Sequence, residues 1–338
     1  MPTNVTPEFR KVQKQYRKVR EPAERLALLK EMLRLIPKHK GTEHLQAEMR
    51  TKMKELTDEL SGPARGGTRT GPQVAFRPEG AGQVVLVGPP NSGKSALHDR
   101  LTGSHAASEA YPFASQFPVP GMFRHGDVAF QLIDVPSLGT EHPVPYVGNT
   151  VQHASGCLLV VDLSAPDCVS RTRASIDLLA EKNVDLIADW SGGDDLEADA
   201  SDDFFRLALP TLLVANKADL IEDPMAELEV LEELIDVSYP TIAVSAVTGF
   251  GLDELGSWLF DQLQVVRVYT KIPGHHPDTE NPFTLHHGDT VIDLAELIHK
   301  DVAAAFSHAR VWGSNTFDGQ RVGRHHQLVD GDIVEIHT

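Results

Sequence analysis

The chain reads Gly88-Pro89-Pro90-Asn91-Ser92-Gly93-Lys94-Ser95, a GxxxxGKS pattern between the apolar run 83–87 and a helix-forming segment at 96–101. This context predicts a glycine-rich turn that leads from a buried strand into a helix. Such a turn gathers backbone N–H donors at the positive end of a helix dipole, where phosphate groups bind. The pattern therefore predicts that Lys94 reaches the β- and γ-phosphates of a nucleotide and that Ser95 binds Mg²⁺. The flanking strand and helix disfavour the alternative, a turn without a ligand.

A second motif, Asn216-Lys217-Ala218-Asp219, follows the apolar run 211–215 and is expected at the carboxyl end of a sheet strand,. The carboxylate of Asp219 can accept hydrogen bonds from the ring N–H and the exocyclic amine of guanine, a donor pair that adenine lacks. Lys217 would lay its alkyl stem over the base, and Asn216 would tie this turn to the phosphate loop. An ordinary polar connection is the alternative, but the order of the two motifs favours a guanine nucleotide.

Two weaker signals lie in the expected order around these motifs. Asp134 follows the run 130–133, where its carboxylate could hold Mg²⁺ through water,. The run 241–244 ends in Ser245-Ala246, a pair that closes over guanine in some nucleotide sites. Because Ser-Ala is common at strand ends, Ser245 carries information only through its position after Asp219.

Composition bounds the class of protein. With 338 residues, 41% hydrophobic and 23% charged, the chain can bury a large core and has room for two or three domains,. The sequence has no run of 18 apolar residues, and residues 1–20 are polar and basic, so we expect a soluble cytoplasmic protein with no membrane partner,. The only two cysteines, Cys157 and Cys168, are expected to be reduced thiols,.

The N-terminal segment differs in charge from the rest. Residues 1–60 hold fourteen Lys/Arg and nine Asp/Glu, a net charge of +5, whereas the remainder of this chain of net charge −17 carries −22. Apolar residues recur at helical spacing on both sides of a break at 37–41, which predicts a helical hairpin over 1–60. They are Leu26, Leu29, Leu33, Ile36, Leu45, Met49, Met53 and Leu56. Its cations could contact RNA phosphates or form a solvated basic face, and both interpretations stay open.

Composition also marks the domain boundaries. The Gly/Pro/Arg-rich stretch that begins at residue 61 predicts a linker over 61–80, followed by a nucleotide-binding domain over 81–264,. The acidic stretch 191–203 favours a solvated loop,.

Residues 265–338 have a different pattern. Strand-like runs at 266–269, 283–285, 309–312 and 332–336 surround a helix that Thr290 would cap, an order that suggests a β-grasp module,. Of the nine histidines here, six stand in adjacent pairs that lack the spacing of metal ligands, which favours surface histidines for these six,. They are His275, His276, His286, His287, His325 and His326.

Taken together, the chain resembles the Obg-related GTPases, most closely the branch of developmentally regulated GTP-binding (DRG) proteins that end in a TGS domain. Four motifs stand in that family's order: Asn91 to Ser95, Tyr111-Pro112-Phe113-Ala114-Ser115, Asp134-Val135-Pro136 and Asn216 to Asp219. The segments 267–271, 298–301, 309–313, 317–323 and 330–336 are similar to TGS sequences, and 38–43 resembles the helical hairpin of that branch. The resemblance implies an α/β P-loop GTPase with a doubly wound sheet, preceded by a helical hairpin and followed by a ubiquitin-like β-grasp TGS domain.

The same resemblance implies that GTP and GDP are the ligands and that GTP hydrolysis serves a ribosome- or RNA-linked role. Its site residues are Gly88, Pro89, Pro90, Asn91, Ser92, Gly93, Lys94, Ser95, Asp134, Ser137, Asn216, Lys217, Asp219, Ser245 and Ala246. Ser95, Ser115 and Asp134 would hold Mg²⁺. Lys94, Ser115 and Asn91 would take part in catalysis, Asn91 because it resembles the asparagine that holds K⁺ in related GTPases.

Three departures from the family pattern bear on the reaction. Ala114-Ser115 replaces Thr-Thr, so Ser115 offers the only hydroxyl for Mg²⁺ and the γ-phosphate there. Ser137 replaces the glycine of Asp-x-Pro-Gly, keeping the N–H but restricting the backbone at φ > 0,. Leu138 stands where Ras-like enzymes use a glutamine to orient water, so slow intrinsic hydrolysis is expected,. The alternatives are a GTP-binding scaffold with little or no hydrolysis, and use of ATP, which the intact Asn216 to Asp219 motif disfavours.

Overall fold

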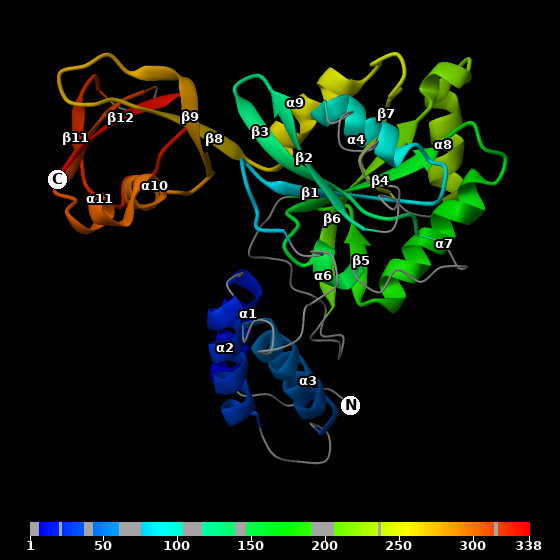
Figure 1. Cartoon of the computed structure of the whole chain (residues 1–338), viewed down its shortest axis with the longest axis horizontal. Helices are drawn as coiled ribbons and strands as arrows, with labels where there is room; N and C mark the ends of the chain where they lie inside the picture. Colours follow the sequence, from blue (N-terminus) through cyan, green and yellow to red (C-terminus); the bar gives the residue numbers. More distant parts are fainter. Residues whose placement is uncertain are drawn as a thin grey trace, which may run out of the picture. The chain divides into compact units, whose positions relative to one another are not determined.

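The computed structural model describes residues 7–19, 22–36, 43–60, 76–103, 117–138, 147–190, 206–235, 238–313 and 317–338 (Figure 1). Ser115, most of the expected linker and the acidic stretch 191–203 lie outside the described residues or at their edge. The chain forms two compact units, 1–73 with 193–206 and 74–192 with 207–338, which are described separately below.

The described residues of the first unit form three helices, one more than the hairpin that the sequence predicts: α1 (Pro7–Lys18), α2 (Pro22–Leu35) and α3 (Glu43–Leu60). The additional helix α1 buries Phe9, Val12 and Tyr16 against the other two. Within the described part of this segment, these three are the large apolar side chains that face the core, and most of the other residues are charged, which is why the sequence pattern missed the helix,.

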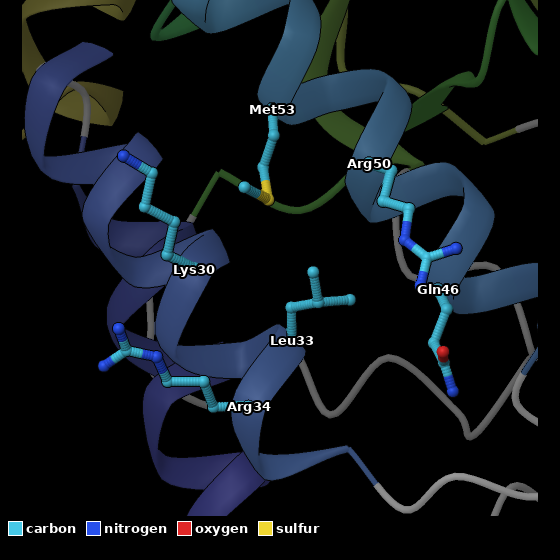
Figure 2. Close-up of a pocket in the computed structure, with 6 residues that line it drawn as sticks. All are labelled: Lys30, Leu33, Arg34, Gln46, Arg50 and Met53. Carbon is cyan, nitrogen blue, oxygen red and sulfur yellow. The ribbon is translucent and has the colours of Figure 1, made fainter.

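A cleft of about 330 Å³ lies between α2 and α3. Figure 2 shows the side chains of Leu33 and Met53 pointing toward one another across it. The cleft is lined by Lys30, Leu33, Arg34, Gln46, Arg50 and Met53. Three of its six lining residues are therefore cations, carried by the two helices that the sequence predicted.

The second unit begins with a seven-stranded sheet in the order β2-β3-β1-β4-β6-β5, with β7 paired to β6. All pairs are parallel except β2 with β3. The strands are β1 (Gln83–Val87), β2 (Val119–His125), β3 (Val128–Asp134), β4 (Gly156–Asp162), β5 (Val184–Ile187), β6 (Leu207–Asn216) and β7 (Thr241–Ala243). Parallel strands must be covered on both faces, and β1 is buried along its whole length,.

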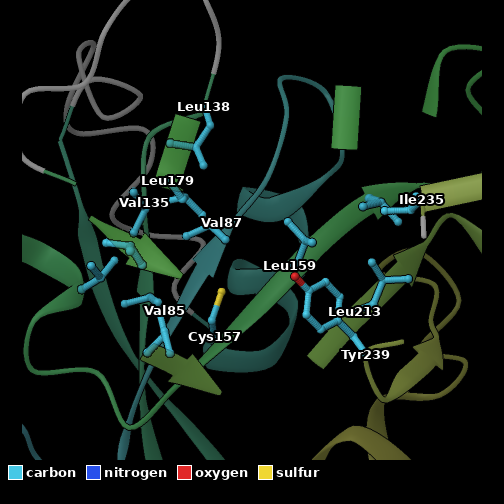
Figure 3. Close-up of a cluster of buried hydrophobic side chains, with 14 of the residues drawn as sticks. Val85, Val87, Val135, Leu138, Cys157, Leu159, Leu179, Leu213, Ile235 and Tyr239 are labelled. Carbon is cyan, nitrogen blue, oxygen red and sulfur yellow. The ribbon is translucent and has the colours of Figure 1, made fainter. Parts of the chain in front are cut away.

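Helices cover both faces of this sheet, which confirms the doubly wound α/β class. They are α4 (Lys94–Thr102), α6 (Val147–Val151), α7 (Cys168–Glu181), α8 (Pro224–Ile235) and α9 (Leu252–Gln262), with a 3₁₀ turn at Ala218–Leu220. On one face Val85 and Val87 pack with Leu159 and with Leu179 of α7 (Figure 3). On the other face Val84 and Leu86 pack with residues of α4 and α9. The alternation along β1 thus divides the core into two layers.

Both cysteines are buried and free. Cys157 of β4 belongs to the layer shown in Figure 3, and burial raises the pKa of its thiol well above the ordinary value. Both side chains therefore act as core groups.

Residues 265–338 form a five-stranded mixed sheet in the order β11-β10-β12-β8-β9, with β12 parallel to β8. Its elements are β8 (Val265–Thr270), β9 (Asp278–His286), α10 (Val291–Ile298), α11 (Lys300–Ala304), β10 (His308–Trp312), β11 (Gln320–Val322) and β12 (Asp332–His337). Helix α10 starts at a capping box made by Thr290 and Asp293, and buries Val291 and Leu294 against the sheet,. The expected β-grasp-like fold is confirmed; the short β11 and α11 were not predicted.

Within the described residues, none of the helices combines the length and the apolar character needed to cross a membrane.

Candidate nucleotide-binding site

The phosphate-loop motif lies where β1 ends and α4 begins, at the carboxyl edge of the sheet. Gly88 has φ 147, and a Cβ atom there would lie 2.2 Å from the carbonyl oxygen of Val160. Gly93 has φ 85, and its Cβ would lie 2.4 Å from Nδ2 of Asn216. Asn91 between them is exposed and left-handed, with φ 64. The two glycines are thus required both for backbone conformation and for close approach to β4 and β6.

Lys94 is the buried cation of this loop, with only 4% of its surface exposed. Its Nζ donates to the carbonyl oxygens of Gly88 and Pro89, each at 3.1 Å, and to Oγ of Ser137 at 3.0 Å. Burial lowers the pKa of Lys94 to about 8, although the charge of Asp134 acts in the opposite direction. The ammonium group is still mostly protonated near pH 7, and it lies inside the turn that would surround a phosphate.

Ser95 and Asp134 form a direct hydrogen bond, with 2.6 Å between Oγ and Oδ2. Among the described residues no partner is found for the other, buried oxygen of Asp134. Burial raises the pKa of Asp134, and the hydrogen bond from Ser95 and the charge of Lys94 oppose that rise. A serine hydroxyl beside a carboxylate with an unpaired buried oxygen is an oxygen donor set that fits Mg²⁺. Ser115, the third expected ligand, lies outside the described residues.

Asn216 joins the phosphate loop to the segment expected around the base. Its side chain is 1% exposed; Nδ2 donates to the carbonyl oxygen of Ser92 at 3.0 Å, and Oδ1 accepts from the N–H of Ala246 at 3.2 Å. One buried amide therefore sets the spacing between loop, strand β6 and the Ser245-Ala246 turn.

Asp219 is exposed and is oriented by Ser245. The Ser245 hydroxyl donates to Oδ1 of Asp219 at 2.5 Å and accepts from the N–H of Thr248 at 3.1 Å. Ser245, which the sequence suggested only through its position after Asp219, is thus in contact with Asp219. This contact holds the Asp219 carboxylate at the same sheet edge as the phosphate loop.

Asp162 is a site residue that the sequence reasoning missed. It ends β4, opposite Asn216 of β6, and its Oδ2 lies 2.6 Å from Nζ of Lys217. Its Oδ1 accepts from Ser164 N–H and Oγ at 3.1 and 2.6 Å. Partial burial raises the pKa of Asp162, but the hydrogen bonds from Lys217 and Ser164 outweigh it and hold the pKa below its ordinary value. In the sequence, the contact with Lys217 is indicated only by the position of Asp162 at the end of a strand that lies beside the strand of the Asn216 motif.

The sequence predicts that Ser137, in place of a glycine, restricts the backbone of the turn after β3, but the structure shows no such strain. Ser137 is exposed, and its φ is not positive, so its side chain imposes no left-handed strain in this conformation. Leu138 donates its N–H to the carbonyl oxygen of Gly88 at 3.1 Å, and its side chain is buried. The position therefore presents no polar side chain that could orient a water molecule.

The geometry agrees with what the chain is similar to. Residues 83–189 match the family described as 50S ribosome-binding GTPase, and residues 266–338 match the TGS domain. The fold and the site therefore define a P-loop GTPase-family protein with a C-terminal TGS domain.

The relatives extend over most of the chain. This chain is 27% identical over 368 residues to Developmentally-regulated GTP-binding protein 1 of Xenopus laevis, and the match covers 92% of this chain and 98% of that protein. It is 25% identical over 369 residues to Ribosome-interacting GTPase 1 of Saccharomyces cerevisiae, covering 93% and 98%. The YchF GTPase of Schizosaccharomyces pombe shares the fold, with a TM-score of 0.52 and 14% identity over 78% of this chain and all of that one. The homologues of this chain are therefore DRG-like GTP-binding proteins, to which it is similar over most of its length.

Proposed function

We propose that this protein binds GTP at the edge of the seven-stranded sheet, hydrolyses it slowly to GDP and phosphate, and couples the nucleotide state to a ribosomal or RNA partner. The observation that carries the nucleotide assignment is the buried Asn216 amide, which bonds the phosphate loop at Ser92 and the base segment at Ala246. Because one side chain spans both motifs, the same ligand would meet the phosphate loop and Asp219 together.

Selection of guanine rests on Asp219. Held by Ser245, its carboxylate can accept both donors of guanine, whereas adenine would leave it unpaired,. Lys217, whose Nζ donates to Asp162, would lay its alkyl stem over the base. Competition by GTP and ATP against a fluorescent guanine nucleotide tests this choice; tighter competition by ATP would contradict it.

At the phosphates, the loop N–H groups and Lys94 would bind the β- and γ-groups. Ser95, Asp134 and Ser115 would hold Mg²⁺, Asp134 through water. Bound Mg²⁺ supplies positive charge that stabilises the phosphate oxygens as charge shifts during hydrolysis. Hydrolysis is slow in this proposal because Leu138 cannot orient the attacking water.

Asn91 is proposed to hold a K⁺ ion that adds charge between the β- and γ-phosphates. The proposal is supported by the resemblance of the loop to potassium-binding GTPases and by the exposed, left-handed position of Asn91. Turnover measured in matched potassium and sodium buffers tests it. Equal rates in the two buffers would rule it out.

A GTP-binding scaffold is the second candidate. It is favoured by Leu138, which is buried and apolar at the position that orients water elsewhere, and by Ser137 in place of glycine. Phosphate release at saturating GTP separates the two functions. Release no faster than that of Lys94→Ala would favour the scaffold.

The partner is proposed from charge and from the relative named as ribosome-interacting. Among the described residues, no carboxylate forms an ion pair with Lys30, Arg34 or Arg50, which line the cleft between α2 and α3. The surrounding segment is net positive, whereas the rest of the chain would repel nucleic acid,. We therefore assign RNA phosphate contact to this cleft, and a ribosomal partner implies a cytoplasmic location.

The sheet of the TGS domain offers a second cationic surface. Along β10, Ala309 and Val311 are buried while Arg310 between them is exposed, directly opposite exposed Arg321 of β11. Arg310 also lies opposite Glu335 of β12, whose carboxylate is bound to Lys271 and His337. An anionic ligand would offset the repulsion between the two facing arginines. Arg310 and Arg321 are therefore proposed as additional contacts to RNA.

Co-sedimentation with ribosomes at two salt concentrations tests the cleft. Arg34→Gln with Arg50→Gln should weaken binding roughly tenfold and reduce its salt dependence. Lys11→Gln with Lys54→Gln removes the same charge from exposed positions outside the cleft and serves as the matched control. Equal binding by the two double variants would remove the reason for assigning the cleft this role.

A further inference from the structure

All three donors of the Lys94 ammonium group are engaged within the chain. A lysine ammonium group has three N–H bonds and cannot accept. Here Nζ contacts the carbonyl oxygens of Gly88 and Pro89 and the hydroxyl oxygen of Ser137, at 3.1, 3.1 and 3.0 Å. The first two acceptors belong to the loop that would surround the phosphates.

We expect a nucleotide phosphate to accept the Nζ–H bond of Lys94 that is directed at Ser137 in this structure. The Gly88 and Pro89 carbonyls are buried backbone groups within the loop. Releasing Lys94 would leave the Pro89 carbonyl without this donor and the Gly88 carbonyl with only the N–H of Leu138,. Ser137 is exposed, and its hydroxyl can turn toward water or toward a ligand at little cost,. Of the three acceptors, Ser137 is the exposed one, and it is the one that can leave Nζ by rotation of a side-chain torsion without moving the loop backbone,.

A displaced hydroxyl still has a hydrogen to donate. Lys94 is the residue that contacts the β- and γ-phosphates in such loops, so an oxygen 3.0 Å from its Nζ lies beside the γ-phosphate position,. Hydrogen bonds to charged acceptors are stronger than those between neutral groups. GTP offers the hydroxyl a charged acceptor there, and GDP offers none.

We infer that the Ser137 hydroxyl determines specificity between GTP and GDP: it occupies the third donor of Lys94 until a nucleotide displaces it, and then donates to the γ-phosphate. The inference rests on the proposed binding of GTP. Ser137, which stands where the family pattern has a glycine, thereby contributes to the choice between GTP and GDP.

The test is equilibrium binding of GDP and of a non-hydrolysable GTP analogue to the full chain. Ser137→Ala removes the acceptor that competes for Lys94, so GDP binding should tighten roughly fivefold. The variant also lacks the hydrogen bond to the γ-phosphate, so the preference for the analogue over GDP should fall roughly tenfold. Ser137→Thr keeps the hydroxyl and should preserve the preference. Ser257→Ala, which removes an exposed serine hydroxyl of α9, is the matched control and should change neither value. The Tm of each variant without nucleotide verifies that it is folded.

An unchanged preference in Ser137→Ala, with both nucleotides bound, would overturn this inference and leave the proposed function intact. A preference that Ser137→Thr loses as fully as Ser137→Ala would also overturn it, since the hydroxyl would then not be responsible. If the wild-type chain bound neither nucleotide, the proposed function itself would fail, and this inference with it.

Discussion

Asp127, in the turn between β2 and β3, accepts hydrogen bonds from two residues of β8. Its Oδ1 lies 3.1 Å from Nη1 of Arg267, and its Oδ2 lies 2.7 Å from the hydroxyl of Tyr269. Arg267 is also bound to Asp330 through Nε and Nη2, at 2.9 and 2.7 Å. Strand β3 runs from this turn to Asp134 of the nucleotide site. Strand β3 thus connects Asp134, the carboxylate proposed to hold Mg²⁺, with the first strand of the TGS domain.

Asp127→Asn should destabilise the protein by about 1 kcal/mol, because it removes a charged acceptor from two donors that are partly screened by solvent. Urea unfolding at pH 7 measures the change. Asp318→Asn replaces an exposed carboxylate of the TGS domain and should be neutral. Equal stability of the two variants would contradict the contribution assigned to this contact.

The effect of Asp127→Asn should depend on pH. Partial burial raises the pKa of Asp127, but hydrogen bonds from Tyr269 and Arg267 outweigh it and hold the pKa below the ordinary 3.8. A carboxyl group with a lowered folded pKa stabilises the protein above its unfolded pKa, and this contribution is lost as pH falls through the folded value. The difference in unfolding free energy between wild type and Asp127→Asn should be constant near neutral pH and shrink below about pH 4. A difference that persists undiminished at pH 3 would argue against this linkage.

Asn216→Ala should impair both the fold and nucleotide binding. It would leave the buried carbonyl of Ser92 and the N–H of Ala246 without this partner, at a cost of about 2 kcal/mol,. Because the loop and the base segment lose their connection, GDP affinity should fall at least roughly tenfold. GDP titration and urea unfolding measure the two effects, with Asn281→Ala of the TGS domain as control. Wild-type affinity in Asn216→Ala would show that the amide does not organise the site.

Asp162→Asn tests the residue that sequence reasoning missed. Lys217 has φ 65 and a partly buried ammonium group whose partner is Asp162. Without that charge the lysine stem is less ordered, and we expect GDP affinity to fall roughly fivefold. Asp177→Asn changes an exposed carboxylate on α7 and should have no effect. Tighter binding in Asp162→Asn would mean that the pair withholds Lys217 from the nucleotide.

Nucleotide affinity should weaken above the pKa of Lys94. Burial lowers that pKa to about 8, with Asp134 opposing, and a bound phosphate favours the protonated form,. Affinity for GDP should therefore be constant from about pH 6 to 7.5 and fall as pH rises from about 8 to 9. Lys94→Met should bind weakly at every pH in this range and show no such decline. The same lowered pKa has the opposite effect on the free protein, whose stability should rise with pH above about 8, since the unfolded chain then binds more protons.

Parts of the site could be predicted because local sequence is sufficient for them. A strand, a glycine-rich turn and a helix are encoded within residues 83–101, and the close approach of Gly88 and Gly93 leaves little room for other side chains,. Asn216 and Asp219 could be placed at the same sheet edge because parallel strands bring their carboxyl ends together. The strand-like runs around a capped helix after residue 265 likewise indicated a β-grasp module,.

Sequence by itself thus determined the sheet, the phosphate loop and the guanine motif, all of which follow from short-range pattern and order along the chain. Only the tertiary structure decided that α1 adds a third helix, that Asp162 holds Lys217, that Ser137 takes the third donor of Lys94 and that Asp127 contacts β8. The three side-chain contacts join residues 43 to 140 positions apart. No local periodicity specifies such pairs, because they depend on which strand ends and turns the folded sheet brings together.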